Sequence, residues 1–214
     1  MLTCICLFAY LLGSVPFGLV FAKLFTKQDL RKIGSGNIGA TNALRAGGWR
    51  LGLATLAGDI SKGAIPVFLA LLLHPGNEPG SPDLWMALAA TIAFLGHLFP
   101  VYLKFSTGGK GVATAAGGFA IISPLALAVS TAAFLAVAGV SRRVSAGSLA
   151  AAALLPVAVF WINGSLILSG CALVISMMII FRHRDNISRL LAGTEPKIGR
   201  LKTEGLRRKE KRIK

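Results

Sequence analysis

Residues 111–141 decide how many times this chain crosses a membrane. They read GVATAAGGFAIISPLALAVSTAAFLAVAGVS and carry no ionisable side chain. One span needs only roughly 20 apolar residues, so this run is too long for a single crossing. The pair Ser123-Pro124 divides it, because serine can cap a helix and proline suits the first helical position. We therefore predict a short helix over residues 111–122, about 18 Å long at the usual helical rise, followed by a full span.

The composition of the whole chain is that of an integral membrane protein. Of its 214 residues, 54% are hydrophobic and only 14% are charged, and the mean hydropathy is +0.70. This is too apolar for a soluble domain with a polar surface. The stretches 2–24, 51–73 and 84–103 are each long enough to cross. Polar breaks at 141–145 and 161–165 divide the rest, so that the chain forms an all-α bundle of seven transmembrane helices, one of them short.

Charge predicts the orientation of this bundle. The sequence holds 23 Lys+Arg against 8 Asp+Glu, a net charge of +15. Residues 23–50 are rich in basic side chains and residues 74–83 have none, which places the first of these segments in the cytoplasm. Seven crossings keep every basic residue on that side, with the N-terminus outside and the C-terminus cytoplasmic. Six would put the basic tail outside, and five would need one span to absorb residues 144–181. We expect a membrane domain over 1–198 and a basic cytoplasmic tail over 199–214.

Three glycine-bearing segments fall on the cytoplasmic side, and the first is KIGSGNIGATNALR at residues 32–45. Ser35 or Asn37 can cap a short helix, and glycines let a ligand approach the backbone closely. The N-terminal amides of that helix would then form an anion site that Arg45 completes. The alternative is a glycine-rich turn that only caps a surface helix.

The second segment is GHLFPVYLKFSTGGKGVAT at residues 96–114. Lys104 and Lys110 flank a glycine loop that opens the short helix, so backbone N–H groups and two ammonium groups can converge on a phosphate. It is not a Walker A loop, because Val112 follows the Lys-Gly pair and no strand precedes it. Lysines that merely snorkel at a helix end would explain the charges but not the glycines.

The third segment is HRDNISRLLAGTEPKI at residues 183–198. His183, Asn186 and Arg189 are spaced by three, so one helical face would present an imidazole, an amide and a guanidinium just beyond the last span. The alternative is a juxtamembrane helix that binds anionic lipid through its charges.

Two further charged pairs lie near the same side. Asp59 and Lys62, three apart in the second span, are a functional candidate because ionisable residues at membrane depth usually have a role. They could equally form a local ion pair that neutralises itself. Arg142 and Arg143, with Ser145, could complete an anion pocket or simply follow the positive-inside rule, and we favour the latter.

Taken together, these segments resemble the bacterial acyl-phosphate-dependent glycerol-3-phosphate acyltransferases, the PlsY family. The resemblance rests on Ser-Gly-Asn-x-Gly-Ala-Thr-Asn-x-x-Arg at 35–45, Gly-His-x-Phe-Pro and Gly-Gly-Lys-Gly-Val-Ala-Thr within 96–114, His-x-x-Asn-Ile-x-Arg-Leu-x-x-Gly-x-Glu at 183–195, and Gly-Asp-Ile-Ser-Lys-Gly at 58–63. It extends to about residue 198. The chain departs from the pattern by its basic extension and by one extra residue before Gly108.

The resemblance implies an enzyme of the bacterial inner membrane that carries out the first step of phospholipid synthesis. It would transfer a fatty acyl group from acyl phosphate to the sn-1 hydroxyl of sn-glycerol 3-phosphate, giving 1-acyl-sn-glycerol 3-phosphate and phosphate. Acyl phosphate already carries a good leaving group, so positioning and charge stabilisation can carry the reaction. The thioester-using glycerolipid acyltransferases have the motif His-x-x-x-x-Asp, and none of the three histidines here has an aspartate five positions later. Acyl-CoA is therefore not the expected donor.

We expect no cofactor, no metal and no nucleic-acid partner; the expected partners are the two substrates and membrane lipid, with a monomer favoured. Catalytic roles are predicted for Ser35, Arg45, Lys104, His183 and Asn186. Substrate contacts are predicted for Ser35, Gly36, Asn37, Thr41, Asn42, Arg45, Lys62, His97, Lys104, Gly108, Gly109, Lys110, Gly111, Arg142, Ser145 and Glu195.

Other functions compatible with seven spans are a transporter of a phosphate ester and an assembly factor that binds anionic lipid. Repeated halves typical of transporters are absent from the sequence, and an assembly factor would not need the glycine loops. For an acyltransferase, His183 could accept the hydroxyl proton, or it could position the substrate while a phosphate oxygen accepts the proton. The lack of an evident orienting carboxylate favours positioning.

Overall fold

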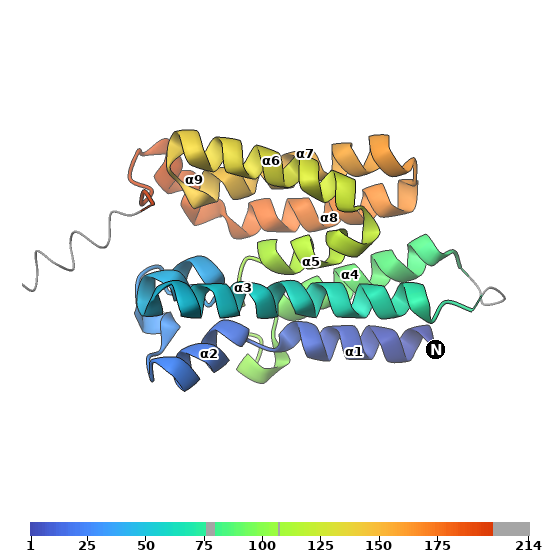
Figure 1. Ribbon diagram of the computed structural model, residues 1–214, viewed down its shortest axis with the longest axis horizontal. Helices are drawn as coiled ribbons and strands as arrows, with labels where there is room; N and C mark the ends of the chain where they lie inside the picture. The colour runs from blue at the N-terminus through green and yellow to red at the C-terminus, as the bar shows by residue number, and fades with distance from the viewer. Residues whose placement is uncertain (76–79, 107, 199–214) are drawn as a thin grey trace, which may run out of the picture.

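The computed structural model describes residues 1–75, 80–106 and 108–198, and over these residues all regular structure is helical. Figure 1 shows the helices lying along one common direction, with α1 to α5 on one side and α6 to α8 on the other. The elements are α1 (Leu2–Ser14), α2 (Phe17–Phe25), η1 (Leu30–Lys32), α3 (Ala40–Leu72), α4 (Pro82–Leu98), η2 (Val101–Leu103), α5 (Val112–Ile122), α6 (Pro124–Ser141), α7 (Val144–Asn163), α8 (Leu166–Arg182) and α9 (Arg184–Leu191).

By length and composition, four to six segments can cross a membrane, and a shorter apolar helix is a further candidate. Four stretches are long and apolar enough by themselves: Ala40–Leu72, Pro82–Leu103, Pro124–Ser141 and Val144–Asn163. Two bent pairs meet the same criterion only together, α1 with α2 at an angle of 42° and α8 with α9 at 59°, and we take α8 as the span and α9 as the helix beyond it. The remaining segment is α5, a shorter apolar helix that ends just before the Ser-Pro pair. The predicted all-α membrane bundle with one short helix is therefore confirmed.

Backbone-breaking residues set where these segments bend. Pro16 stands between α1 and α2, where its missing N–H interrupts the helical ladder. Gly48 has a φ of 80° inside α3, so the helix that begins at Ala40 consists of a short first part and a long span. The short part is the helix predicted after the first glycine segment. Arg142 has a φ of 55° at the reversal between α6 and α7.

Small residues let the short α5 lie directly against α3. A Cβ atom on Gly63 would lie 2.0 Å from the carbonyl oxygen of Thr114, and one on Gly117 would lie 1.9 Å from that of Ile60. Only glycine leaves room for backbones this close. Gly117 therefore permits the close packing of the short helix against α3.

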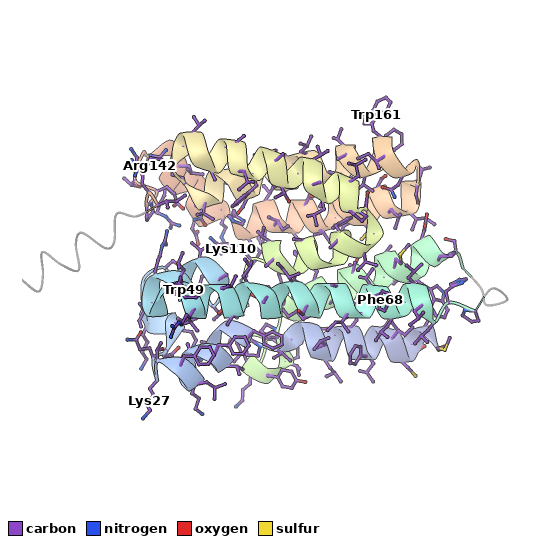
Figure 2. The ribbon with its side chains drawn as sticks, viewed as in Figure 1. Lys27, Trp49, Phe68, Lys110, Arg142 and Trp161 are labelled. Atoms are coloured by element: carbon purple, nitrogen blue, oxygen red, sulfur yellow. The ribbon has the colours of Figure 1, made fainter. Side chains whose placement is uncertain are left out.

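The two ends of the bundle differ in their side chains. Figure 2 shows Lys27, Trp49 and Arg142 at one end, and Trp161 at the opposite end, where the N-terminus also lies. The α9 helix and the reversal between α6 and α7 share the end with Lys27. The first and third glycine-bearing segments therefore lie at this end, and Lys110 of the second lies farther in along the bundle (Figure 2). The predicted basic tail, 199–214, lies outside the described residues.

Candidate active site

A buried carboxylate joins α7 to α9 at the basic end. Glu195 is 7% exposed; its Oε1 accepts hydrogen bonds from Ser145 Oγ and Asn186 Nδ2, both at 2.7 Å. Its Oε2 accepts one from Arg189 Nε at 2.8 Å. Burial alone would raise the pKa of Glu195, but these hydrogen bonds outweigh it and hold that pKa below its ordinary value. Both oxygens of Glu195 are therefore engaged within the protein, where they join its neighbours, and its substrate contact remains a prediction.

Lys110 reaches this carboxylate group through one amide. Its Nζ donates a hydrogen bond to Asn186 Oδ1, and the same amide donates to Glu195. Burial lowers the pKa of Lys110 to about 8; Glu195 and Asp185 oppose this effect, while Arg189 and Arg45 add to it. Three cationic groups and two carboxylates thus act on this region, and one of the carboxylates, Glu195, is already paired. Such an excess of positive charge favours an anionic ligand.

His183 lies at the junction of α8 and α9 and is 2% exposed. Its Nδ1 lies 2.8 Å from the carbonyl oxygen of Ile179, which can only accept, so Nδ1 carries the proton and Nε2 has the lone pair. Burial, and then the charge of Lys110, lower the pKa of His183 to about 4. The imidazole is therefore neutral at physiological pH. The predicted spacing is also confirmed in part, because Asn186 and Arg189 both reach Glu195.

The first glycine segment is organised by Asn42. This residue is 2% exposed; its Nδ2 donates to the carbonyl oxygens of Leu30, Ile33 and Asn37 at 2.8–3.0 Å. Its Oδ1 accepts the backbone N–H of Ser35. The amide of Asn42 therefore holds the loop in place, and its contact with substrate remains a prediction.

The helix that follows starts differently from the prediction. Gly39 is the N-cap of α3 and no side chain caps it, so neither Ser35 nor Asn37 has the expected capping role. Asn37 Oδ1 instead accepts the N–H of Gly39 at 2.8 Å, which tightens the turn. Ser35 is exposed, and Thr41 lies in the first turn of the helix. Gly36 has a φ of 69°, a left-handed conformation that suits glycine.

Lys62 and His97 lie inside the protein and do not line the cationic region. Lys62, 1% exposed, pairs with Asp59 at 2.8 Å and donates to the carbonyl oxygen of Val15, which also accepts the N–H of Phe17. His97 Nδ1 lies 3.7 Å from Asp59 Oδ1 and 3.2 Å from Thr114 Oγ1. This internal network uses their polar groups to join α1, α3, α4 and α5, and it contains the local Asp59–Lys62 ion pair that the sequence offered as one alternative. The substrate contacts of Lys62 and His97 remain predictions.

Lys104 and Lys110 have different surroundings. Lys104 is exposed and follows η2, which packs against α1, where Tyr10 Oη donates to the carbonyl oxygen of Phe99. Lys110 is partly buried and donates to Asn186. The convergence of the two lysines on a phosphate remains a prediction. One backbone amide of the glycine loop is engaged within the protein, because the Gly109 N–H donates to the carbonyl oxygen of His97. Gly111, with a φ of 80°, begins α5 beside the Phe94 ring.

The reversal between α6 and α7 is tied to the end of the described chain. Arg142 is exposed, and its carbonyl oxygen accepts the N–H of Ile198 at 2.7 Å. Arg143 donates to the carbonyl oxygen of Gly193 at 3.4 Å. The backbone of Arg142 thus holds the segment that contains Glu195. The substrate contact of the Arg142 side chain remains a prediction.

Arg182 is the site residue that the sequence did not single out. It donates from Nη2 to the carbonyl oxygen of Gly108 at 2.7 Å and from Nε to that of Gly109 at 3.2 Å. A basic residue at the end of a span is common, so its position gave no signal of this contact. Among the described residues, no group of three His, Cys, Asp or Glu side chains lies close enough to hold a metal ion.

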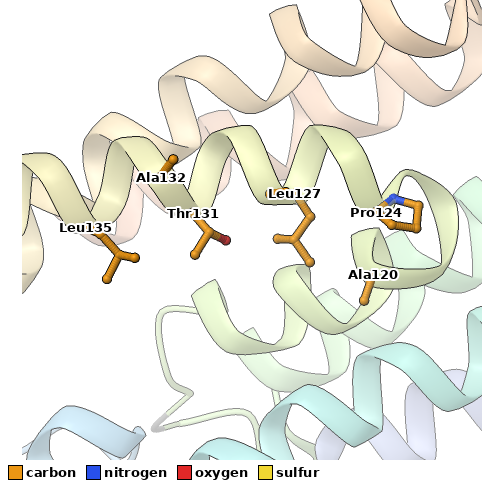
Figure 3. Close-up of a pocket in the computed structure, with 7 residues that line it drawn as sticks. Ala120, Pro124, Leu127, Thr131, Ala132 and Leu135 are labelled. Atoms are coloured by element: carbon orange, nitrogen blue, oxygen red, sulfur yellow. The ribbon is translucent and has the colours of Figure 1, made fainter.

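An apolar groove of about 420 Å³ runs along α6 beside α5. Figure 3 shows Leu127, Thr131 and Leu135 projecting from one side of α6, with Ala120 of α5 opposite the start of that helix. The lining is completed by Pro124, Ala128 and Ala132. The groove lies between helices and takes apolar groups, in contrast to the charged region around Lys110.

Comparison with known proteins identifies the family. A family model described as glycerol-3-phosphate acyltransferase matches residues 3–193. A glycerol-3-phosphate acyltransferase of Syntrophotalea carbinolica is 47% identical over 187 residues, covering 87% of this chain and 92% of the relative. One of Geobacter metallireducens is 50% identical over 187 residues, with the same coverage of each chain. The chain belongs to the glycerol-3-phosphate acyltransferase family and is a membrane-embedded acyltransferase.

Solved structures agree with this assignment. The fold is similar to a crystal structure of PlsY, an integral membrane glycerol 3-phosphate acyltransferase, in its glycerol 3-phosphate form. The TM-score is 0.86 at 38% identity, covering 94% of this chain and 98% of that one. The lysophosphatidic acid form of PlsY matches with a TM-score of 0.82 at 37% identity, covering 92% of this chain and 95% of that one.

Proposed function

We propose that this protein transfers a fatty acyl group from acyl phosphate to the sn-1 hydroxyl of sn-glycerol 3-phosphate. The observation that carries the proposal is the cationic region in which Arg45 and Arg189 act electrostatically on Lys110, beside α9. Both proposed substrates are phosphates, and one has a lipid tail. Charge-assisted contacts to phosphate are strong, and an apolar groove between helices can take the tail.

The reaction needs no covalent enzyme intermediate. The sn-1 hydroxyl oxygen attacks the acyl carbonyl carbon, a new C–O ester bond forms, and the C–O bond to phosphate breaks. Inorganic phosphate leaves with the electron pair, and the hydroxyl proton passes to a phosphate oxygen. Arg45, Lys110 and Asn186 would hold the anionic groups, with Ser35, Thr41 and Lys104 as further predicted contacts. Their task is to align the two substrates and stabilise charge.

His183 positions the substrate in this scheme and does not take the proton. Because the pKa of His183 is lowered to about 4, its imidazole is a weaker base than a phosphomonoester, whose second pKa is about 6. We expect His183→Asn to lose well under about 100-fold in turnover, the size expected for a missing general base. The acidic limb of its kcat/KM profile should coincide with that of the wild type. A loss of about 100-fold or more in turnover, with unchanged substrate affinity, would instead identify His183 as the base.

The groove along α6 is the proposed site of the acyl chain. Ala128→Phe would fill part of it, and displacing two methylenes costs about 1.6 kcal/mol, or roughly a tenfold loss in kcat/KM. We therefore expect this loss with a long-chain acyl phosphate and almost none with a short-chain one. Val140→Phe is the control, since Val140 is on the same helix but 91% exposed. Equal losses for both chain lengths, or for both variants, would place the acyl chain elsewhere.

A single assay separates the proposed reaction from its alternatives. Purified protein in detergent is given acyl phosphate and glycerol 3-phosphate, and release of phosphate is measured together with formation of lysophosphatidate. Stoichiometric appearance of both products is expected. Turnover with acyl-CoA but not acyl phosphate would overturn the donor, and binding of glycerol 3-phosphate without turnover with any donor would favour a transporter.

The sidedness of the bundle is a proposal that follows from its charge. We propose a monomeric protein of the bacterial inner membrane with the N-terminus outside and the Lys27 and Arg142 end in the cytoplasm. On a background in which the three cysteines are replaced, single cysteines at Ser141 and Gly164 report opposite ends of α7. An impermeant thiol reagent should label the cysteine at Gly164 in intact cells and label the one at Ser141 only after lysis. The reverse pattern would invert the topology.

A further inference from the structure

Two peptide carbonyl groups of the glycine loop face the Arg182 guanidinium. Arg182 is the last residue of α8, and its Nη2 and Nε donate to the carbonyl oxygens of Gly108 and Gly109 at 2.7 and 3.2 Å. The contact joins segments more than 70 residues apart in sequence. It also places the loop beside His183, the next residue along the chain. The end of α8 is therefore bound to the second glycine-bearing segment here, while the Lys110–Asn186 hydrogen bond joins that segment to the third.

The same loop is held from its opposite side by α4. The Gly109 N–H donates to the carbonyl oxygen of His97 at 3.3 Å. A Cβ atom on Gly108 would lie 1.7 Å from the carbonyl oxygen of Leu98, and one on Gly109 would lie 2.1 Å from His97 Nε2. The loop backbone thus lies between α4 and Arg182 with no spare room. Lys110 is the next residue, so the orientation of its side chain depends on these contacts of Gly108 and Gly109 with Arg182 and α4.

We propose that Arg182 is a positioning residue that sets Lys110 for phosphate binding; this rests on the proposed function. The carbonyl oxygen is the negative end of a peptide dipole, and two such oxygens turned toward an anion would repel it. Arg182 binds both through charge-assisted hydrogen bonds, which are stronger than neutral ones. Its planar fork can hold two neighbouring carbonyls at once, as a lysine ammonium cannot with the same geometry. Arg182 therefore acts on phosphate through the loop and Lys110.

The test compares Arg182→Met and Arg182→Lys with the wild type in the acyltransferase assay. Without the hydrogen bonds from Arg182, the glycine loop no longer fixes the position of Lys110. The KM for glycerol 3-phosphate should therefore rise about tenfold for Arg182→Met, the size expected for loss of one charge-assisted contact. Turnover should change much less than KM. The alkaline limb of kcat/KM should move to higher pH, because a Lys110 released into solvent regains its ordinary pKa. Arg182→Lys should recover part of the KM.

The matched control is Arg184→Met, which removes a neighbouring cation whose side chain is 65% exposed and should leave KM and the alkaline limb unchanged. An Arg182→Met enzyme with wild-type KM and alkaline limb would overturn the proposal, as would a loss confined to turnover. If Arg182→Met fails to fold, Arg182→Lys decides by the same two readouts, and failure of both to fold assigns Arg182 a folding role instead. If the wild type itself does not use acyl phosphate, calorimetric binding of glycerol 3-phosphate tests Arg182 independently of the donor.

Discussion

Lys110→Met is expected to lower kcat/KM for glycerol 3-phosphate by about 100- to 1,000-fold, the range seen when one preorganised donor is removed from a catalytic site. Lys110 is partly buried, its Nζ donates to Asn186, and Arg45 and Arg189 act on it electrostatically. Its charge is therefore held in place before substrate arrives. The variant should stay folded, because a methionine fills similar space without a buried charge.

The same residue predicts a pH dependence. The pKa of Lys110 is lowered to about 8, and only the protonated form attracts phosphate, so kcat/KM should fall as pH rises through about 8. Lys110→Arg keeps its charge at all accessible pH values and should lack this limb. Kinetics of the purified enzyme between pH 6 and roughly 10 measure it. Lys197→Met serves as the control, since Lys197 is exposed. If kcat/KM of Lys110→Arg still fell at the same pH as that of the wild type, the ionisation would belong to another group.

Glu195→Ala should give the largest loss of stability among the site variants, about 3 kcal/mol in the free energy of unfolding. Its carboxylate accepts hydrogen bonds from Ser145, Asn186 and Arg189, and the first two of these donors are buried. Removing the carboxylate leaves both without a partner and frees the end of α9 from α7. Thermal unfolding in detergent should show a lower Tm, and activity should fall with it.

Asp185→Asn is the matched control for this change. Asp185 carries a carboxylate on the same helix, but its side chain is 77% exposed and its ion pair with Arg184 is long, at 3.7 Å. Surface pairs of this kind contribute little, so the Tm should not change. A Glu195→Ala protein as stable as Asp185→Asn would mean that Glu195 does not join α7 to α9.

Much of the fold follows from local features of the sequence. The length of residues 111–141 and the Ser123-Pro124 pair predict the short helix and the span after it, because both reflect local backbone chemistry. The spacing by three also places Asn186 and Arg189 on one helical face toward Glu195. These predictions need no knowledge of which helices are neighbours.

The sequence could not predict the contacts between distant segments. It offered the Asp59–Lys62 ion pair as one alternative, but not the carbonyl oxygen of Val15, 47 residues from Lys62, that also accepts from Lys62. Nor did it predict that η2, which precedes Lys104, packs against α1. Helical periodicity reports which residues share a face and says nothing of what packs against that face. Arg182 went unnoticed for the same reason.

Glu195 is translated late, so the candidate site can assemble only near the end of synthesis. Lys110 and Ser145 are made well before it, and at roughly 5–20 residues per second the ribosome needs several seconds to pass from residue 110 to residue 195. During that time the earlier helices can enter the bilayer, but α9 has no carboxylate to anchor it to α7. A chain that ends before Glu195 therefore has most of its membrane helices but lacks the hydrogen bonds around Glu195. We expect such a prematurely terminated product to stay in the membrane and to be inactive.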